Sequence, residues 1–197
     1  MKIRLLFSFI LLMGCVQLNA QDKSLPYYEI PAYPDTYTAA NVAARMIDGV
    51  GFRYYWATEG LREQDLVFKP SGESRTTVET LTHIYELSMT VINATKKVPN
   101  ITDREKQVLT FSEMRKRTLE NLKAASDQLK ASTDKDLSEY KMIFKNGKGT
   151  TEFPYWYQLN GPIADALWHI GQVVSLRRSS GNPFNSKVSV LQGKLIE

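Results

Sequence analysis

Apolar residues recur at the spacing of an α-helix in four long stretches of the chain. Within each stretch they return every three or four residues, so that they share one face of a helix with about 3.6 residues per turn. The stretches cover residues 38–59, 76–97, 112–131 and 160–181. Four long helices joined by short connections predict an all-α protein folded as a four-helix bundle.

Local patterns indicate how the first two helices begin and pack. Thr76 and Glu79 have the spacing of a capping box, in which each side chain accepts a hydrogen bond from the other residue's backbone N–H. We therefore expect the second helix to begin there. Gly49 and Gly51 interrupt the first helix at a cost of roughly 1 kcal/mol each relative to alanine. We interpret them as positions where a neighbouring helix packs closely.

The segment before the last stretch combines a hairpin signal with a proline. Residues 140–144 and 150–153 contain β-branched and aromatic side chains and flank an Asn-Gly turn signal, which predicts a short β-hairpin. Pro162 either begins the last helix at its first turn or kinks a longer helix that begins near Pro154. After this helix, the apolar run at 188–191 fits a strand or an extended clamp.

The N-terminus has the features of a signal peptide. Lys2 and Arg4 precede an apolar run, Leu5 to Met13, that is too short to span a bilayer. Cleavage after Ala20 would give an exported protein, periplasmic or secreted. A lipobox-like sequence ending at Cys15 offers a second route, which would leave the protein lipid-anchored through that cysteine. We favour cleavage after Ala20.

Beyond the signal peptide, residues 1–20, the chain reads as one domain with two extensions. Residues 21–35 carry three prolines among tyrosines, which predicts an extended arm lying on the domain surface. Residues 36–184 form the helical domain, and residues 185–197 form a C-terminal tail. No apolar run of the predicted mature chain is long enough to form a transmembrane segment.

Composition narrows the chemistry that this domain can perform. Cys15 is the only cysteine, so cleavage after Ala20 would remove disulfides, thiolate metal ligands and cysteine nucleophiles from consideration. The formal charge of +4 would fall to +2 with the loss of Lys2 and Arg4. Basic and acidic residues alternate along the helices, which predicts no nucleic acid partner and leaves an unknown small molecule as the expected ligand.

The stretch 160–181 is chemically the most informative, because polar residues interrupt an apolar helix. Asp165, His169 and Gln172 follow one another at offsets of four and three and so share one stripe. Burying a carboxylate and an imidazole is costly unless something pairs with them. The stripe should therefore face a pocket, a hydrogen-bonding partner or a metal ion. We place this helix at the centre of the domain, with Leu167 and Ile170 on its buried side.

Other residues near the candidate site have simpler interpretations. His83, the only other histidine, lies at the edge of the apolar face of the second helix. We interpret the aromatic run at 54–56 as packing rather than as the wall of a substrate pocket. Arg177 and Arg178 are interpreted as charges that favour the C-terminal end of a helix rather than as anion ligands.

Two motifs resemble the DinB-like superfamily of four-helix bundles. One is Thr80-Leu81-Thr82-His83-Ile84; the other runs from Ala166-Leu167-Trp168-His169-Ile170-Gly171-Gln172 to Arg177-Arg178 and Gly181-Asn182-Pro183. The resemblance extends from the first helix to just past Pro183. In that family one histidine of the second helix and two of the last, four residues apart, hold a divalent metal ion. The family includes metal-dependent transferases that act with small thiols, and many members without a known activity.

This resemblance implies that His83, Asp165 and His169 are metal ligands. Asp165 stands where the family has a histidine, and two histidines with one carboxylate form a ligand set that suits zinc, nickel or iron. Gln172 either hydrogen-bonds a metal-bound water or a ligand imidazole, or satisfies backbone groups near a kink.

The resemblance implies a metal-dependent transferase or hydrolase of unknown substrate. The alternative is a non-catalytic exported bundle, acting in binding or structure, in which Asp165 accepts a hydrogen bond from a histidine and no metal binds.

Overall fold

The described residues are mostly helical, as the apolar pattern predicts. The computed structural model describes residues 24–103, 105 and 107–197. The predicted signal peptide, with Cys15, and the first residues of the arm lie outside this part of the chain. Where the chain is described, no helix is both long enough and apolar enough to cross a membrane.

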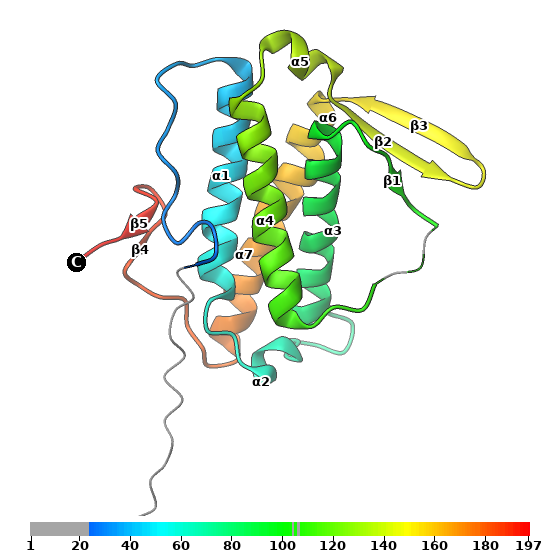
Figure 1. Ribbon diagram of the computed structural model, residues 1–197. Helices are drawn as coiled ribbons and strands as arrows, with labels where there is room; N and C mark the ends of the chain where they lie inside the picture. Colours follow the sequence, from blue (N-terminus) through cyan, green and yellow to red (C-terminus); the bar gives the residue numbers. More distant parts are fainter. Residues whose placement is uncertain (1–23, 104, 106) are drawn as a thin grey trace, which may run out of the picture.

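Four long helices lie side by side and enclose the hydrophobic core (Figure 1). They are α1 (Ala39–Thr58), α3 (Thr77–Thr95), α4 (Phe111–Lys130) and α7 (Ala164–Ser179). Helix α1 packs against α4 and α7, and α3 packs against the same two helices. Large side chains that are almost fully buried between them include Ile47, Trp56, Leu81, Ile84, Leu119 and Leu129.

Threonine caps explain where these helices begin. At α3 the backbone N–H of Thr76 donates to the Glu79 carboxylate at 2.7 Å, and the backbone N–H of Glu79 donates to Thr76 Oγ1 at 3.2 Å. The predicted capping box is therefore confirmed. Thr110 and Glu113 form the same arrangement at the start of α4. Each box satisfies backbone donors that the first helical turn leaves without a partner.

The predicted hairpin is present and belongs to a small sheet. Strand β2 (Lys141–Asn146) pairs antiparallel with β3 (Gly149–Pro154), and β1 (Asn100–Ile101) pairs parallel with β2. The apolar pattern did not predict β1, nor the short helices α2 (Glu63–Leu66) and α5 (Asp134–Glu139). The hairpin projects from the α3 side of the helices (Figure 1).

A kink precedes the helix that carries the candidate site. Helix α6 (Trp156–Gln158), the π-helical turn η1 (Leu159–Ile163) and α7 follow one another without a break. Within η1, Gly161 has the non-helical angles φ −95° and ψ −110°, and Pro162 follows it. A proline has no backbone N–H and its ring clashes with the preceding turn, which accounts for the kink. Of the two alternatives for Pro162, the structure therefore has the kinked longer helix.

The N-terminal arm contributes to the core, so its predicted position on the surface is wrong in part. Tyr27 is only 3% exposed, and its hydroxyl donates to the buried Asp48 carboxylate at 3.1 Å. A Cβ added to Gly51 would lie 2.4 Å from the Tyr27 ring. The close approach at Gly51 is thus made by the arm and not by a neighbouring helix. At Gly49 the nearest group is the guanidinium of Arg53 on the same helix.

The C-terminal tail folds back beside this arm. Strands β4 (Val188–Ser189) and β5 (Lys194–Leu195) form a second antiparallel hairpin, which refines the predicted strand or clamp. The backbone N–H of Ile30 donates to the Gly193 carbonyl at 2.8 Å and ties the arm to the tail. Residues of both extensions line a cleft between α1 and α7.

Helix α7 is not central, contrary to the prediction. One of its sides is buried through Ala166, Ile170 and Val173, whereas Trp168 on another side is 73% exposed. The prediction of burial is confirmed for Ile170, but Leu167 is only partly buried. Polar residues interrupt the apolar pattern of this helix because one of its sides packs against α1 and α3 and another faces solvent.

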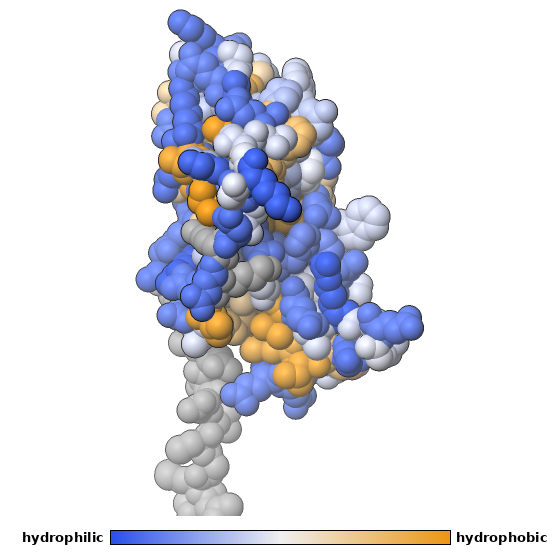
Figure 2. All heavy atoms as spheres, turned by 90° about the vertical axis from the view of Figure 1, so that its right-hand side faces the viewer, coloured by the Kyte–Doolittle hydropathy of each residue, from blue (hydrophilic) through white to orange (hydrophobic). Residues whose placement is uncertain are grey.

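Much of the surface is polar. On the face shown in Figure 2, hydrophilic residues predominate and hydrophobic residues gather in separate patches. This distribution agrees with the mixed charges of the helices. Any binding site on the described residues is therefore better sought in clefts than on a broad apolar face.

Candidate metal centre

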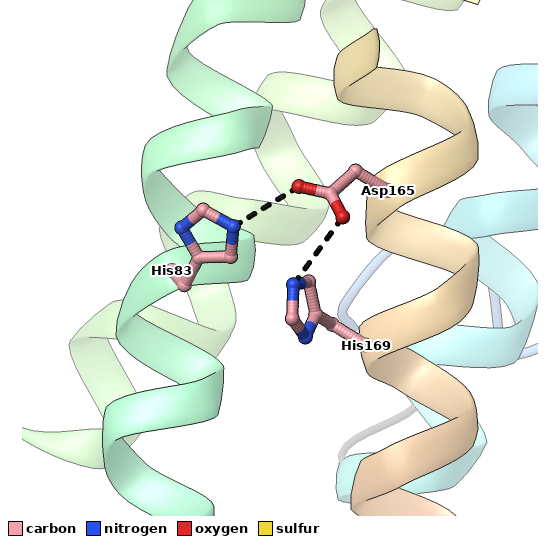
Figure 3. Close-up of side chains that lie close together, drawn as sticks. All are labelled: His83, Asp165 and His169. Atoms are coloured by element: carbon pink, nitrogen blue, oxygen red, sulfur yellow. Dashed lines mark hydrogen bonds and ion pairs between the residues drawn. The ribbon is translucent and has the colours of Figure 1, made fainter. Parts of the chain in front are cut away.

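Three side chains predicted as metal ligands meet between α3 and α7 (Figure 3). His83 Nε2 lies 3.1 Å from Asp165 Oδ2, and His169 Nε2 lies 3.3 Å from Asp165 Oδ1. The two imidazole rings are perpendicular, with their centroids 4.6 Å apart. The predicted convergence of these residues is therefore what the structure shows.

The local sequence explains this convergence. Asp165 and His169 are four residues apart on α7, a spacing that brings two side chains to the same face of a helix. His83 comes from α3, which packs directly against α7. The capping box at Thr76 and Glu79 fixes the start of α3, and the kink at Pro162 sets the direction of α7.

The cluster is half-buried at the edge of an open cleft. The exposed fractions of the side chains are 31% for His83, 39% for Asp165 and 15% for His169. The cleft has a volume of about 490 Å³ and contains both histidines. Its other lining residues are Pro70, Ser74, Arg75, Thr80, Gln172, Ser175 and Leu176. A small molecule could thus reach the cluster from solvent.

Gln172 orients one of the imidazoles. Its Oε1 lies 2.8 Å from Nδ1 of His169. An amide oxygen can only accept a hydrogen bond, so Nδ1 is the donor in this contact. A neutral His169 then carries its lone pair on Nε2, the atom that faces Asp165. Of the alternatives for Gln172, the contact with a ligand imidazole is the one that the geometry supports.

This tautomer places two acceptors against each other. The Nε2 lone pair of a neutral His169 would face the carboxylate oxygen of Asp165 at 3.3 Å. Two acceptors at this distance repel one another unless a proton or a metal ion lies between them. A metal ion held by both groups would remove this repulsion, and a proton on Nε2 would also remove it.

The spacing of the ligand atoms fits a small divalent metal ion. One ligand atom from each of the three residues can be chosen so that all lie within 4.8 Å of one another. Two atoms that are each about 2.1 Å from a zinc ion at a tetrahedral angle lie about 3.4 Å apart. The separations of 3.1 and 3.3 Å are close to that value, although they end on different oxygens of Asp165. The three residues together could therefore hold a metal ion.

Several residues near this helix are structural. Tyr54, Tyr55 and Trp56 are at most 1% exposed, so the interpretation as packing is confirmed. Arg177 is buried and donates to the carbonyls of Trp56, Ala57 and Glu59 at the end of α1. It is therefore more than an exposed charge at the end of its own helix, because it joins the ends of α1 and α7.

Sequence reasoning did not identify the polar residues opposite the cluster. Ser74 and Arg75 belong to the connection before α3, and Thr80 lies one turn before His83 on that helix. Ser74 and Arg75 have no helical periodicity that would associate them with the site. Only the packing of this connection beside α7 shows that they face the cleft.

Comparisons with protein-family models, with curated proteins and with solved structures found no match for this chain. The geometry of the cluster and the motifs that carry its residues are therefore the features that bear on its function.

Proposed function

We propose that this chain is an exported, DinB-like four-helix bundle that binds a divalent metal ion through His83, Asp165 and His169 and acts as a metal-dependent transferase or hydrolase. The observation that carries the proposal is the convergence of all three side chains within 4.8 Å at the edge of an open cleft. The two motifs that carry these residues resemble that family, with Asp165 in place of a histidine.

Each residue of the site has a distinct part in this proposal. His83 and His169 would offer Nε2 atoms, Asp165 would offer a carboxylate oxygen, and Gln172 holds the His169 ring in orientation through Nδ1. A bound divalent ion would supply Lewis acidity to a water molecule or a substrate carbonyl. Three protein ligands would leave at least one coordination position for water or substrate, the open arrangement of catalytic sites. Arg75 and Ser74 line the same cleft and would bind and orient the substrate.

A non-catalytic bundle is the second candidate, and one specific observation favours it. The contact of 3.1 Å between His83 Nε2 and Asp165 Oδ2 is a good hydrogen bond without any metal. In that case the cluster joins α3 to α7 and has only a structural role. The two candidates differ in whether the purified protein binds metal at all.

The test is metal content and thermal stability of protein purified without a histidine tag. We expect about one zinc, nickel or iron ion per chain, and a rise in melting temperature when that metal is added to the metal-free protein. His83→Ala, Asp165→Ala and His169→Ala should each abolish the rise. Asp127→Ala, which removes an exposed carboxylate on α4, should leave it unchanged. A wild-type protein without such a rise at neutral pH would favour the non-catalytic bundle.

A further inference from the structure

A second and larger cleft lies on the other side of α7. It has a volume of about 1030 Å³ and is formed by α1, α7, the arm and the C-terminal tail. Ser175 lines both this cleft and the one that holds the candidate metal centre. The volume is at the upper end of the range of about 300–1000 Å³ that is usual for small-molecule sites. We call it the arginine cleft, after Arg45, Arg53 and Arg178.

The charge of the arginine cleft is strongly one-sided. Arg45, Arg53 and Arg178 line it, and within the described residues no carboxylate lines it or forms an ion pair with any of the three. Arg45 donates to the Pro31 carbonyl at 2.7 Å, and Arg53 donates to the Gly49 carbonyl at 3.1 Å. Each guanidinium has five N–H donors, so these contacts leave several free for a ligand.

Two of the arginines come from neighbouring helix ends. Arg53 lies near the C-terminal end of α1 and Arg178 near that of α7. Arg177 joins these ends by donating to the carbonyls of Trp56 and Ala57 at 3.1 and 3.0 Å. Like charges that line one cleft repel, and a bound anion would offset that cost. Planar guanidinium groups are also well suited to carboxylate and phosphate oxygens.

Most of the remaining wall of the arginine cleft is apolar, and Ser175, Asn185 and Ser186 are its polar members. Met46 of α1 faces Leu167, Ile170 and Val174 of α7 across it, and further apolar side chains come from the arm and the tail. Gly171 lies between these α7 residues, and a Cβ added there would meet nothing within 4 Å. The cleft therefore offers an apolar length with Arg53 and Arg178 toward the C-terminal ends of their helices and Arg45 beside Met46, and a hydrated inorganic anion would not use the apolar length.

We propose that the arginine cleft binds an amphiphilic anion, a carboxylate attached to an extended apolar body. The carboxylate would accept hydrogen bonds from Arg53 and Arg178, and the apolar body would lie along Met46, Leu167 and Val174. This site is distinct from the candidate metal centre, and its ligand binds whether or not a metal ion is present.

Calorimetric titration with octanoate tests this assignment. The full mature protein is used in the presence of a chelator, so that the carboxylate cannot bind to a metal ion. We expect saturable binding of about one octanoate per chain, at least about tenfold weaker binding of acetate, and no binding of octylammonium. Arg53→Gln and Arg178→Gln should each weaken octanoate binding about tenfold, as expected for loss of a charge-assisted hydrogen bond.

Two further variants test whether octanoate binds in the arginine cleft itself or is only attracted to a basic surface. Lys116→Gln on α4 removes the same charge away from the cleft and should leave the affinity unchanged. Gly171→Leu keeps every arginine but fills the apolar wall, and it should abolish binding without loss of the folded state. Equal binding of acetate and octanoate, an unchanged affinity in both arginine variants, or undiminished binding to Gly171→Leu would each overturn the proposal.

Discussion

His83 Nε2 on α3 lies 3.1 Å from Asp165 Oδ2 on α7, although the two residues are 82 positions apart in the chain. The same carboxylate approaches His169 through its other oxygen at 3.3 Å. Asp165 therefore connects two imidazoles that belong to different helices. The role of this carboxylate distinguishes the two functional candidates: it is a metal ligand in one and only a hydrogen-bond acceptor in the other.

Replacement of Asp165 by asparagine and by histidine separates these roles. Asp165→Asn keeps the shape and one carbonyl acceptor but removes the charge, so we expect metal affinity to fall at least about tenfold. Asp165→His creates a three-imidazole site, which should bind nickel and zinc and show a metal-dependent rise in melting temperature. Competition with a chromogenic chelator measures the metal affinity of both variants. A wild-type stability that does not depend on metal, together with a lower stability of metal-free Asp165→Asn, would indicate the hydrogen-bonded cluster without metal.

Gln172 provides a prediction about orientation. Its Oε1 fixes the His169 ring through Nδ1 at 2.8 Å. Loss of such an outer contact commonly costs about 10–100-fold in metal affinity, and we expect Gln172→Ala to fall in that range. Gln172→Glu keeps an acceptor oxygen and should restore binding to near the wild-type level. A structural role of Gln172 would instead change the melting temperature of the metal-free protein, which circular dichroism measures. Ser179→Ala, an exposed position of α7 that does not line the cleft, is the control.

The helices and the shared face of Asp165 and His169 could be predicted because both depend on local rules. Thr76 with Glu79 determines where α3 begins, and the four-residue spacing of Asp165 and His169 determines that they share a face. His83 was identifiable because it is the only other histidine of the chain.

The arrangement around the site depends on tertiary packing and could not be predicted in this way. Nothing in the pattern of α7 shows that Trp168 faces solvent or that Arg75 lies opposite His169. The burial of Tyr27 could not be predicted for the same reason, because an extended arm rich in proline has no periodicity from which its contacts could be inferred.

The packing of Tyr27 gives a test of the fold. Alanine in a helix is ordinarily favoured over glycine by roughly 1 kcal/mol. At Gly171 the added methyl group meets nothing within 4 Å, so Gly171→Ala should stabilise the protein by up to that amount. At Gly51 the methyl group would lie 2.4 Å from the Tyr27 ring, so Gly51→Ala should displace the arm and destabilise the protein by about 1–3 kcal/mol. Urea unfolding compares the two, and a stabilising Gly51→Ala would contradict the position of the arm.

Asp65 gives a prediction about acid stability. Its carboxylate is buried and accepts hydrogen bonds from the Arg62 guanidinium at 2.8 and 2.9 Å, from Ser180 at 2.7 Å and from Asn182 at 2.6 Å. Burial alone would raise the pKa of Asp65, but these hydrogen bonds outweigh burial and hold the pKa well below its ordinary value. The charged carboxylate thus joins α2 to the end of α7.

Because the pKa of Asp65 is lower in the folded than in the unfolded protein, its contribution to stability is complete above the unfolded value of about 4. It is lost progressively as the pH falls from there through the folded value. Asp65→Asn should therefore cost about 1–3 kcal/mol near neutral pH, and the difference from wild type should shrink below about pH 4. Urea unfolding at a series of pH values measures this difference. Asp127→Asn, an exposed carboxylate on α4, should show little difference at any pH. If the stability difference between Asp65→Asn and the wild type stays unchanged at acid pH, then the shape of the side chain, and not its charge, holds α2 against α7.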